Sequence, residues 1–148
     1  MRKVIILGII SVLFSVGLSA QIRKIPASVT NAFEQKYPLA RDVEFKDVLS
    51  SIHIHFVLDS EVMVAKYSNN GEWKETEKEW SYNKLSPEVQ DGFQKSKYVD
   101  EWKVKETAII YLPGGSEQYR LKVEKNDVQK KYLYFDKKGR LLRDALTI

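Results

Sequence analysis

The clearest pattern along the chain is the alternation of apolar and polar residues. In 51–58, apolar Ile52, Ile54 and Phe56 alternate with His53 and His55. A two-residue period is typical of a strand with one face buried and the other turned to solvent. Similar alternation, bounded by short polar or glycine-containing connections, predicts further strands at 43–46, 61–67, 108–112, 117–124, 128–135 and 140–146.

Two shorter stretches have a four-residue period instead, which predicts helices. In 25–37 the apolar residues lie four apart, and Pro38 prevents the helix from continuing. In 85–93, Ser86 is a suitable N-cap and Pro87 suits the first helical position. Gly92 lowers the helix propensity of this second stretch.

These elements recur in the same order, which predicts an internal duplication. The stretch "IPASVTNAF" (25–33) matches "LSPEVQDGF" (85–93), and "ARDVEFKD" (40–47) matches "VDEWKVKE" (99–106). "YSNNGEW" (67–73) matches "FDKKGRL" (135–141), where the glycine is expected to form the last hairpin turn of each copy. We therefore predict an α+β fold of two tandem repeats, 21–80 and 81–148, each a helix followed by about four antiparallel strands.

The first 20 residues have the order of a secretory signal peptide. Arg2 and Lys3 precede an apolar run from Val4 to Val16, and small residues follow before an expected cleavage after Ala20. The apolar run is shorter than the roughly 20 residues of an ordinary membrane span. An uncleaved N-terminal anchor is the alternative. Export predicts a periplasmic or secreted protein with no membrane association after cleavage.

The signal-like start, the repeated helix with Val and Phe four apart, and the hairpins "YSNNGEW" and "FDKKGRL" together resemble PepSY-like exported bacterial proteins. These are grouped with the beta-lactamase-inhibitory-protein-like (BLIP-like) fold. The resemblance implies a tandem α+β module with no cofactor and no catalysis. The inhibitor that gives this fold its name holds its enzyme with the concave face of its sheet. No inhibitor-specific binding motif is recognisable in the present chain.

Composition removes several classes of function. Without residues 1–20 the chain keeps 22 of its 24 basic side chains and all 20 acidic ones, so its charge is nearly balanced. A nucleic-acid partner is therefore not expected. There is no cysteine, which excludes disulfides, thiolate nucleophiles and cysteine-based zinc sites.

The two histidines are the first candidates for chemistry. On a strand, His53 and His55 point to the same side, roughly 7 Å apart. A metal would need a third ligand, such as Asp47, Asp59 or Glu61, from a neighbouring strand or turn. The alternative is that these histidines simply occupy the solvent side of a strand. A metal-binding or small-ligand site on the His53 and His55 face therefore remains the second hypothesis.

Catalysis has little support in the sequence. There is no G-x-S-x-G elbow, and "PGGSE" (113–117) lacks the lysine and spacing of a phosphate-binding loop. The carboxylates of "EWKETEKEW" (72–80) alternate with lysines, a pattern that usually protects an exposed sheet edge from pairing. We expect a protein that is not an enzyme.

The outward-facing positions of the strands are the stronger candidate. If Leu133 and Phe135 face the core, their neighbours face away, as do the matching positions of the first copy. Tyrosine, with an apolar ring and a polar tip, is favoured at interfaces. The alternative is that the two copies bury these faces against each other. We predict that a protein or peptide of the cell envelope binds Lys130, Tyr132, Tyr134, His53, His55, Val64 and Lys66, with Trp80 either joining the copies or contacting the partner.

Overall fold

The computed structural model describes residues 24–147, so the predicted signal peptide lies outside the described part. Helix α1 (Ala27–Lys36) precedes strands β1 (Arg41–Val48), β2 (Ser51–Leu58), β3 (Glu61–Ser68) and β4 (Trp73–Trp80). A 3₁₀ turn (Tyr82–Lys84) leads to helix α2 (Pro87–Gln94). The remaining strands are β5 (Lys103–Tyr111), β6 (Glu117–Glu124), β7 (Lys130–Phe135) and β8 (Leu141–Leu146), with a 3₁₀ turn (Pro113–Gly115) between β5 and β6.

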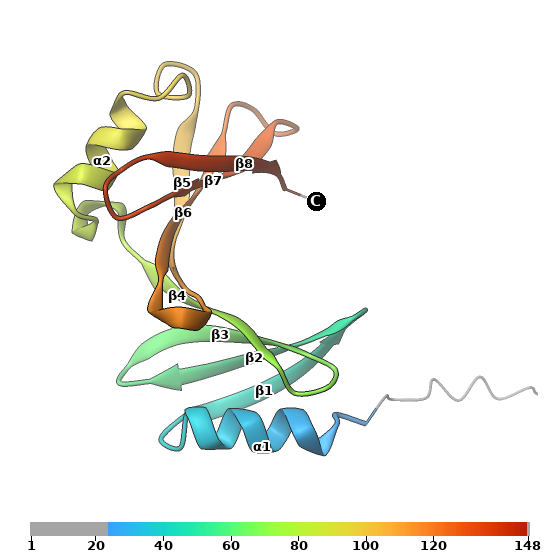
Figure 1. The fold of residues 1–148 in the computed structure, drawn as a ribbon. Coiled ribbons are helices and arrows are strands. Elements are labelled where there is room, and N and C mark those ends of the chain that lie inside the picture. Colours follow the sequence, from blue (N-terminus) through green and yellow to red (C-terminus); the bar gives the residue numbers. More distant parts are fainter. Residues whose placement is uncertain (1–23, 148) are drawn as a thin grey trace, which may run out of the picture.

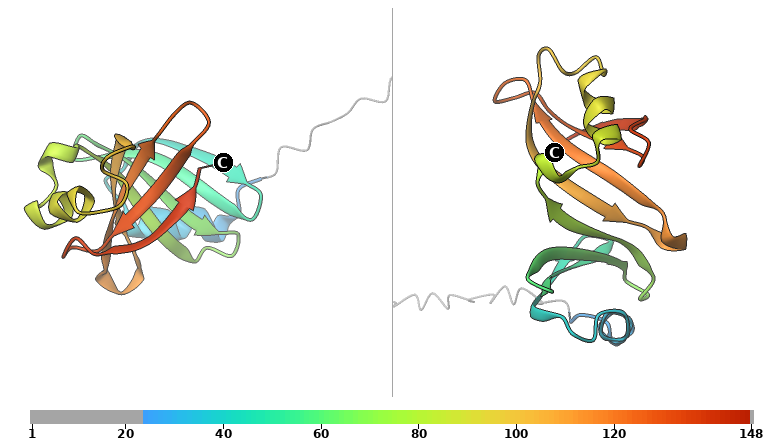
Figure 2. Two further views of the ribbon diagram at one scale, coloured as in Figure 1. Left: turned by 90° about the horizontal axis from the view of Figure 1, so that it is seen from above. Right: turned by 90° about the vertical axis from the view of Figure 1, so that its left-hand side faces the viewer.

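All eight strands form one antiparallel sheet in chain order. The sheet is strongly curved, and both helices lie on its outer side (Figure 1). Strands β4 and β5 pair from Thr76 with Tyr111 to Trp80 with Thr107, which makes the sheet continuous across the middle of the chain. The views in Figure 2 show each helix beside the strands that are close to it in sequence. The predicted α+β class, helix positions and order of strands are confirmed.

Local sequence explains both helices. Pro26 precedes α1 in an extended conformation, and Pro38 follows the end of the helix, where it cannot continue the backbone hydrogen bonding. The Ser86 hydroxyl accepts a hydrogen bond from the Val89 backbone N–H, so Ser86 caps α2 as predicted.

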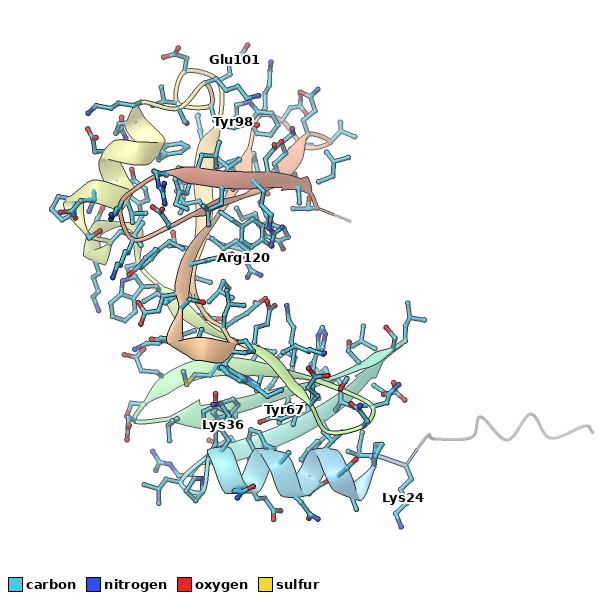
Figure 3. The ribbon with its side chains drawn as sticks, viewed as in Figure 1. Lys24, Lys36, Tyr67, Tyr98, Glu101 and Arg120 are labelled. Carbon is cyan, nitrogen blue, oxygen red and sulfur yellow. The ribbon has the colours of Figure 1, made fainter. Side chains whose placement is uncertain are left out.

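The first core lies between α1 and strands β2 and β3. Val29 and Phe33 of α1 are buried, and the Phe33 ring meets Phe56 edge to face at 5.0 Å between centroids. Tyr67 lies between the sheet and α1 (Figure 3) and is fully buried. The other buried members are Ile52, Ile54, Met63 and Ala65.

The second core repeats this arrangement under α2. Val89 and Phe93 of α2 are buried at the positions that the sequence matches to Val29 and Phe33. The other buried members are Leu85, Tyr98, Leu121, Val123, Leu133 and Phe135. Both cores therefore lie on the outer side of the curved sheet. On the other face Val62 is exposed and Tyr132 and Tyr134 are only half-buried, so the alternative that the two halves bury these faces against each other does not hold.

Two strands differ from the sequence-based expectation. The alternation in 43–46 predicts that Val43 and Phe45 point to the same side; both line a pocket with Phe33 on the α1 side, but Val43 stays 39% exposed because β1 is an edge strand. The pairing of β1 with β2 is irregular between Arg41 and Glu44, where Asp42 has a φ of 52°, and this edge irregularity turns the start of β1 out of register. The mixed charge of 72–80 predicts a protected edge strand, but β4 lies in the middle of the sheet.

The glycine of each repeated heptad forms a hairpin turn, as predicted. Gly71 and Gly139 have φ angles of 90° and 78°, which a residue with a β-carbon adopts only with strain. Both turns also contact a helix. A β-carbon at Gly71 would lie 2.7 Å from the Ser28 carbonyl oxygen of α1.

Candidate functional site

The face of the sheet that points away from both helices carries all of the predicted binding residues except Trp80. We call it the inner face, because it lines the inside of the curve. On β2 and β3, His53 pairs with Lys66 and His55 with Val64. On β6 and β7, Arg120 pairs with Tyr134, Lys122 with Tyr132 and Glu124 with Lys130. Antiparallel partners share a face, so these side chains all lie opposite the cores.

Trp80 is placed differently from the other predicted residues. It pairs with buried Thr107 and packs partly against the second core, so it belongs to the outer side of the sheet. The pairing of β3 with β4 ends at Met63 and Lys78, whereas β4 continues to Trp80 beside β5. The sheet is therefore open beside Trp80, which is one of the residues that line a cavity at this opening.

An ion-pair cluster occupies the middle of the inner face. The Glu77 carboxylate of β4 accepts hydrogen bonds from Lys66 Nζ and, at 2.6 Å, from Arg120 Nη1. Lys66 Nζ also donates to Glu75 at 2.7 Å. Only 13% of the Glu77 side chain is exposed. The cluster connects β3, β4 and β6, and it therefore joins residues from the N-terminal and C-terminal halves of the sheet.

The cluster shifts the pKa values of its members and of the neighbouring His53. Burial alone would raise the pKa of Glu77, but hydrogen bonds from Arg120 and Lys66 outweigh it and hold that pKa below its ordinary value. Burial would lower the pKa of Lys66, but the carboxylates of Glu75 and Glu77 raise it. Burial and the nearby Lys66 charge lower the pKa of His53. Glu77 and Lys66 are therefore charged near neutral pH, whereas His53 is mainly uncharged.

Arginines cover the two tyrosines of β7. The Arg120 guanidinium lies 4.6 Å from the centre of the Tyr132 ring, and that of Arg143 lies 3.4 Å from the centre of the Tyr134 ring. The two tyrosine rings meet edge to face with centroids 6.4 Å apart. Stacked aromatic and guanidinium groups of this kind are enriched at protein interfaces.

The sequence alone did not identify Glu77, Arg120 or Arg143 as members of this site. Glu77 was seen only as part of a mixed-charge stretch, and Arg120 is 43 residues away from it in sequence. The one available signal was the two-residue period of 117–124, which places Arg120 opposite buried Leu121.

The histidines are not part of a recognisable metal centre. Within residues 24–147, no three His, Asp or Glu side chains come close enough together to hold a metal ion. His53 and His55 lie beside Lys66 and Val64, and neither of these is a metal ligand at neutral pH. The three carboxylates considered as third ligands thus do not complete a site.

Comparison with known proteins gives similarity in structure only. No family model matches the chain, and no curated protein matches it. A DUF2874 family protein from Bacteroides ovatus is 22% identical, with a TM-score of 0.74 over 83% of this chain and 88% of that chain. A BLIP-like protein from Bacteroides fragilis is 25% identical, with a TM-score of 0.71 over 84% and 87%. A protein from Bacteroides eggerthii, provisionally described as periplasmic, is 21% identical, with a TM-score of 0.71 over 83% and 89%.

These similarities show an α+β fold like that of BLIP-like proteins. They give no support to the PepSY part of the sequence resemblance. Among the described residues, no helix is long and apolar enough to cross a membrane.

Proposed function

We propose that this protein is an exported, non-catalytic binding protein of the bacterial envelope, and that its inner face engages a protein or peptide partner. One observation carries the proposal: the inner face belongs to neither core and presents Tyr132 and Tyr134, each stacked with an arginine. Rigid aromatic side chains with polar tips supply large contact areas at little entropic cost. The curvature of the sheet gives this face a concave shape (Figure 1).

Placement in the periplasm or outside the cell rests on two supports. The first 20 residues have the order of a signal peptide, and the similar Bacteroides eggerthii protein is provisionally described as periplasmic. The order of one helix and four strands, met twice, supports a duplicated module at 21–80 and 81–148. The BLIP-like neighbour adds an inhibitory role as a specific form of the proposed function.

The test is affinity capture with protein purified from the envelope of cells that express the full chain. The key variant is Tyr132→Ala combined with Tyr134→Ala, and Leu39→Ala, an exposed residue between α1 and β1, is the control. We expect the wild type and the control to retain the same partner and the double variant to lose it at unchanged thermal stability. Equal capture by all three proteins, or capture by none, would contradict binding through this face.

A small-ligand or metal-binding role for the His53 and His55 face is the alternative. It retains support because the two histidines point to one side of β2. Calorimetric titration with zinc or nickel tests it, with His53→Ala combined with His55→Ala as the control. A flat isotherm for the wild type at micromolar protein would dispose of the metal form of this alternative.

A further inference from the structure

A cavity of about 320 Å³ opens on the inner face beside the end of β4. It lies where β3 stops pairing with β4 and β4 continues along β5. Strands β3 to β6 all contribute to its wall, so residues of both sequence copies meet in it. This volume lies in the range of sites that hold small molecules or single side chains.

One part of the cavity wall is apolar. Val62 and Val64 of β3, Ala108 of β5 and Trp80 of β4 line it. Val62 is 46% exposed, so its side chain offers apolar surface to an occupant of the cavity. An occupant with an aliphatic stem would cover this surface.

The rest of the wall carries the guanidinium of Arg120, which is paired with Glu77, and three carboxylates that differ in how far they are already neutralised. Glu77 is bound by Lys66 and Arg120. Glu106 pairs with Lys122, but 61% of its side chain stays exposed. Glu79 is exposed and has no ion pair with any residue in 24–147. The cavity therefore has an unused acceptor at Glu79 and a partly used one at Glu106.

We propose that the cavity receives a lysine or arginine side chain of the partner. The aliphatic stem of this side chain lies against Val62, Val64 and Ala108. Its cationic head lies at the carboxylates of Glu79 and Glu106. The inference rests on the proposed function and specifies the chemistry of the partner. Long basic side chains combine an apolar stem with a charged head, which is the combination that this wall matches. Lys78 and Lys84 already lie over the Trp80 ring, so the carboxylates and not the ring attract the incoming charge.

The test uses the peptide acetyl-Gly-Gly-Arg-Gly-Gly-amide and a peptide of the same sequence with neutral citrulline in place of arginine. Binding is followed through the backbone amide NMR signals of Glu79, Glu106 and Ala108. We expect the arginine peptide to shift these signals saturably, with a dissociation constant on the order of 1 mM, and the citrulline peptide to shift them much less. Glu79→Gln should lower the affinity for the arginine peptide by about fivefold. Glu88→Gln, on the exposed start of α2, should leave binding unchanged.

Equal shifts with both peptides, no saturation, or an unchanged affinity in Glu79→Gln would overturn the proposal. The two proposals can fail separately. If the wild type captures a partner that the Tyr132 and Tyr134 double variant loses, but the arginine peptide causes no specific shift, then the cation site is removed and the proposed function stands. Arginine-specific binding without any captured partner would remove the proposed function instead.

Discussion

Gly92 of α2 lies so close to the last hairpin that a β-carbon added to it would come within 2.0 Å of the Gly139 carbonyl oxygen. The contact is mutual, because a β-carbon at Gly139 would lie 2.0 Å from the Glu88 carbonyl oxygen of α2. Helix α2 and the β7–β8 hairpin thus meet backbone to backbone. The glycine that lowers the helix propensity of 85–93 is therefore required by packing.

We expect Gly92→Ala to lower the free energy of unfolding by about 1–3 kcal/mol, because no side chain fits at this contact. Helix propensity alone predicts the opposite effect, an increase of about 1 kcal/mol in the free energy of unfolding. Urea denaturation followed by circular dichroism distinguishes the two. A more stable Gly92→Ala variant would show that the contact is looser than described.

The turn glycines offer a second comparison. Gly139 and Gly114 both have positive φ angles, 78° and 82°, but an added β-carbon at Gly114 meets nothing within 4 Å. Gly114→Ala should therefore lower the free energy of unfolding only by the backbone strain, about 1–2 kcal/mol. Gly139→Ala should cost clearly more in the same denaturation experiment, and similar losses would contradict the close approach to α2.

Replacement of Glu77 tests the ion-pair cluster. Glu77→Gln leaves Lys66 and Arg120 without their shared carboxylate, and we expect it to lower the free energy of unfolding by about 1–3 kcal/mol. Glu79→Gln is the matched control, because Glu79 is exposed and lies on the same strand. Its effect should stay within about 0.5 kcal/mol. Equal effects of the two substitutions would show that the cluster does not stabilise the fold.

The same pair of variants predicts a pH dependence. The folded-state pKa of Glu77 lies below its ordinary value of 4.5, so its contribution is present above that pH and is lost as the pH falls through the folded-state pKa. Denaturation from neutral pH down to about pH 3 should show a shallower loss of stability in Glu77→Gln than in wild type. Parallel curves would contradict the depressed pKa.

Lys66 should control the protonation of His53. Burial and the Lys66 charge lower the pKa of His53, whereas Glu77 and Glu75 raise it. Lys66→Met removes the repulsion and leaves the carboxylates, so we expect the pKa of His53 to rise, as measured by NMR titration. Lys74→Met, an exposed lysine paired with Glu72, is the control and should leave the titration unchanged. An unshifted His53 in Lys66→Met would count against the cluster geometry.

The alternation of residues was enough to predict which side chains share the inner face. His53, His55 and Lys66 follow the two-residue period of their strands, and so do Tyr132 and Tyr134, because every second side chain of a strand turns to the same side. The periods also located both helices and their buried residues. These features depend on local geometry, which a sequence contains directly.

The features that the sequence did not reveal depend on contacts between distant strands. The mixed charges of 72–80 have the same local pattern on an edge strand as on a central one, and only the pairing of β4 with β5 decides between them. The bond from Arg120 to Glu77 requires β4, β5 and β6 to be adjacent. Likewise, the tight contact of Gly92 depends on where the hairpin packs, which no local pattern contains.

Both hydrophobic cores lie on the outer side of the sheet, and this has a consequence for how the protein can evolve. Tyr132 and Tyr134 are half-buried, Glu79 is exposed, and none of the three belongs to either core, so substitutions there change the inner surface without altering the packing of Phe33 or Phe93. If the proposed function holds, descendants of such a scaffold can acquire new partners by exchanging a few inner side chains while the outer half of the molecule stays as it is.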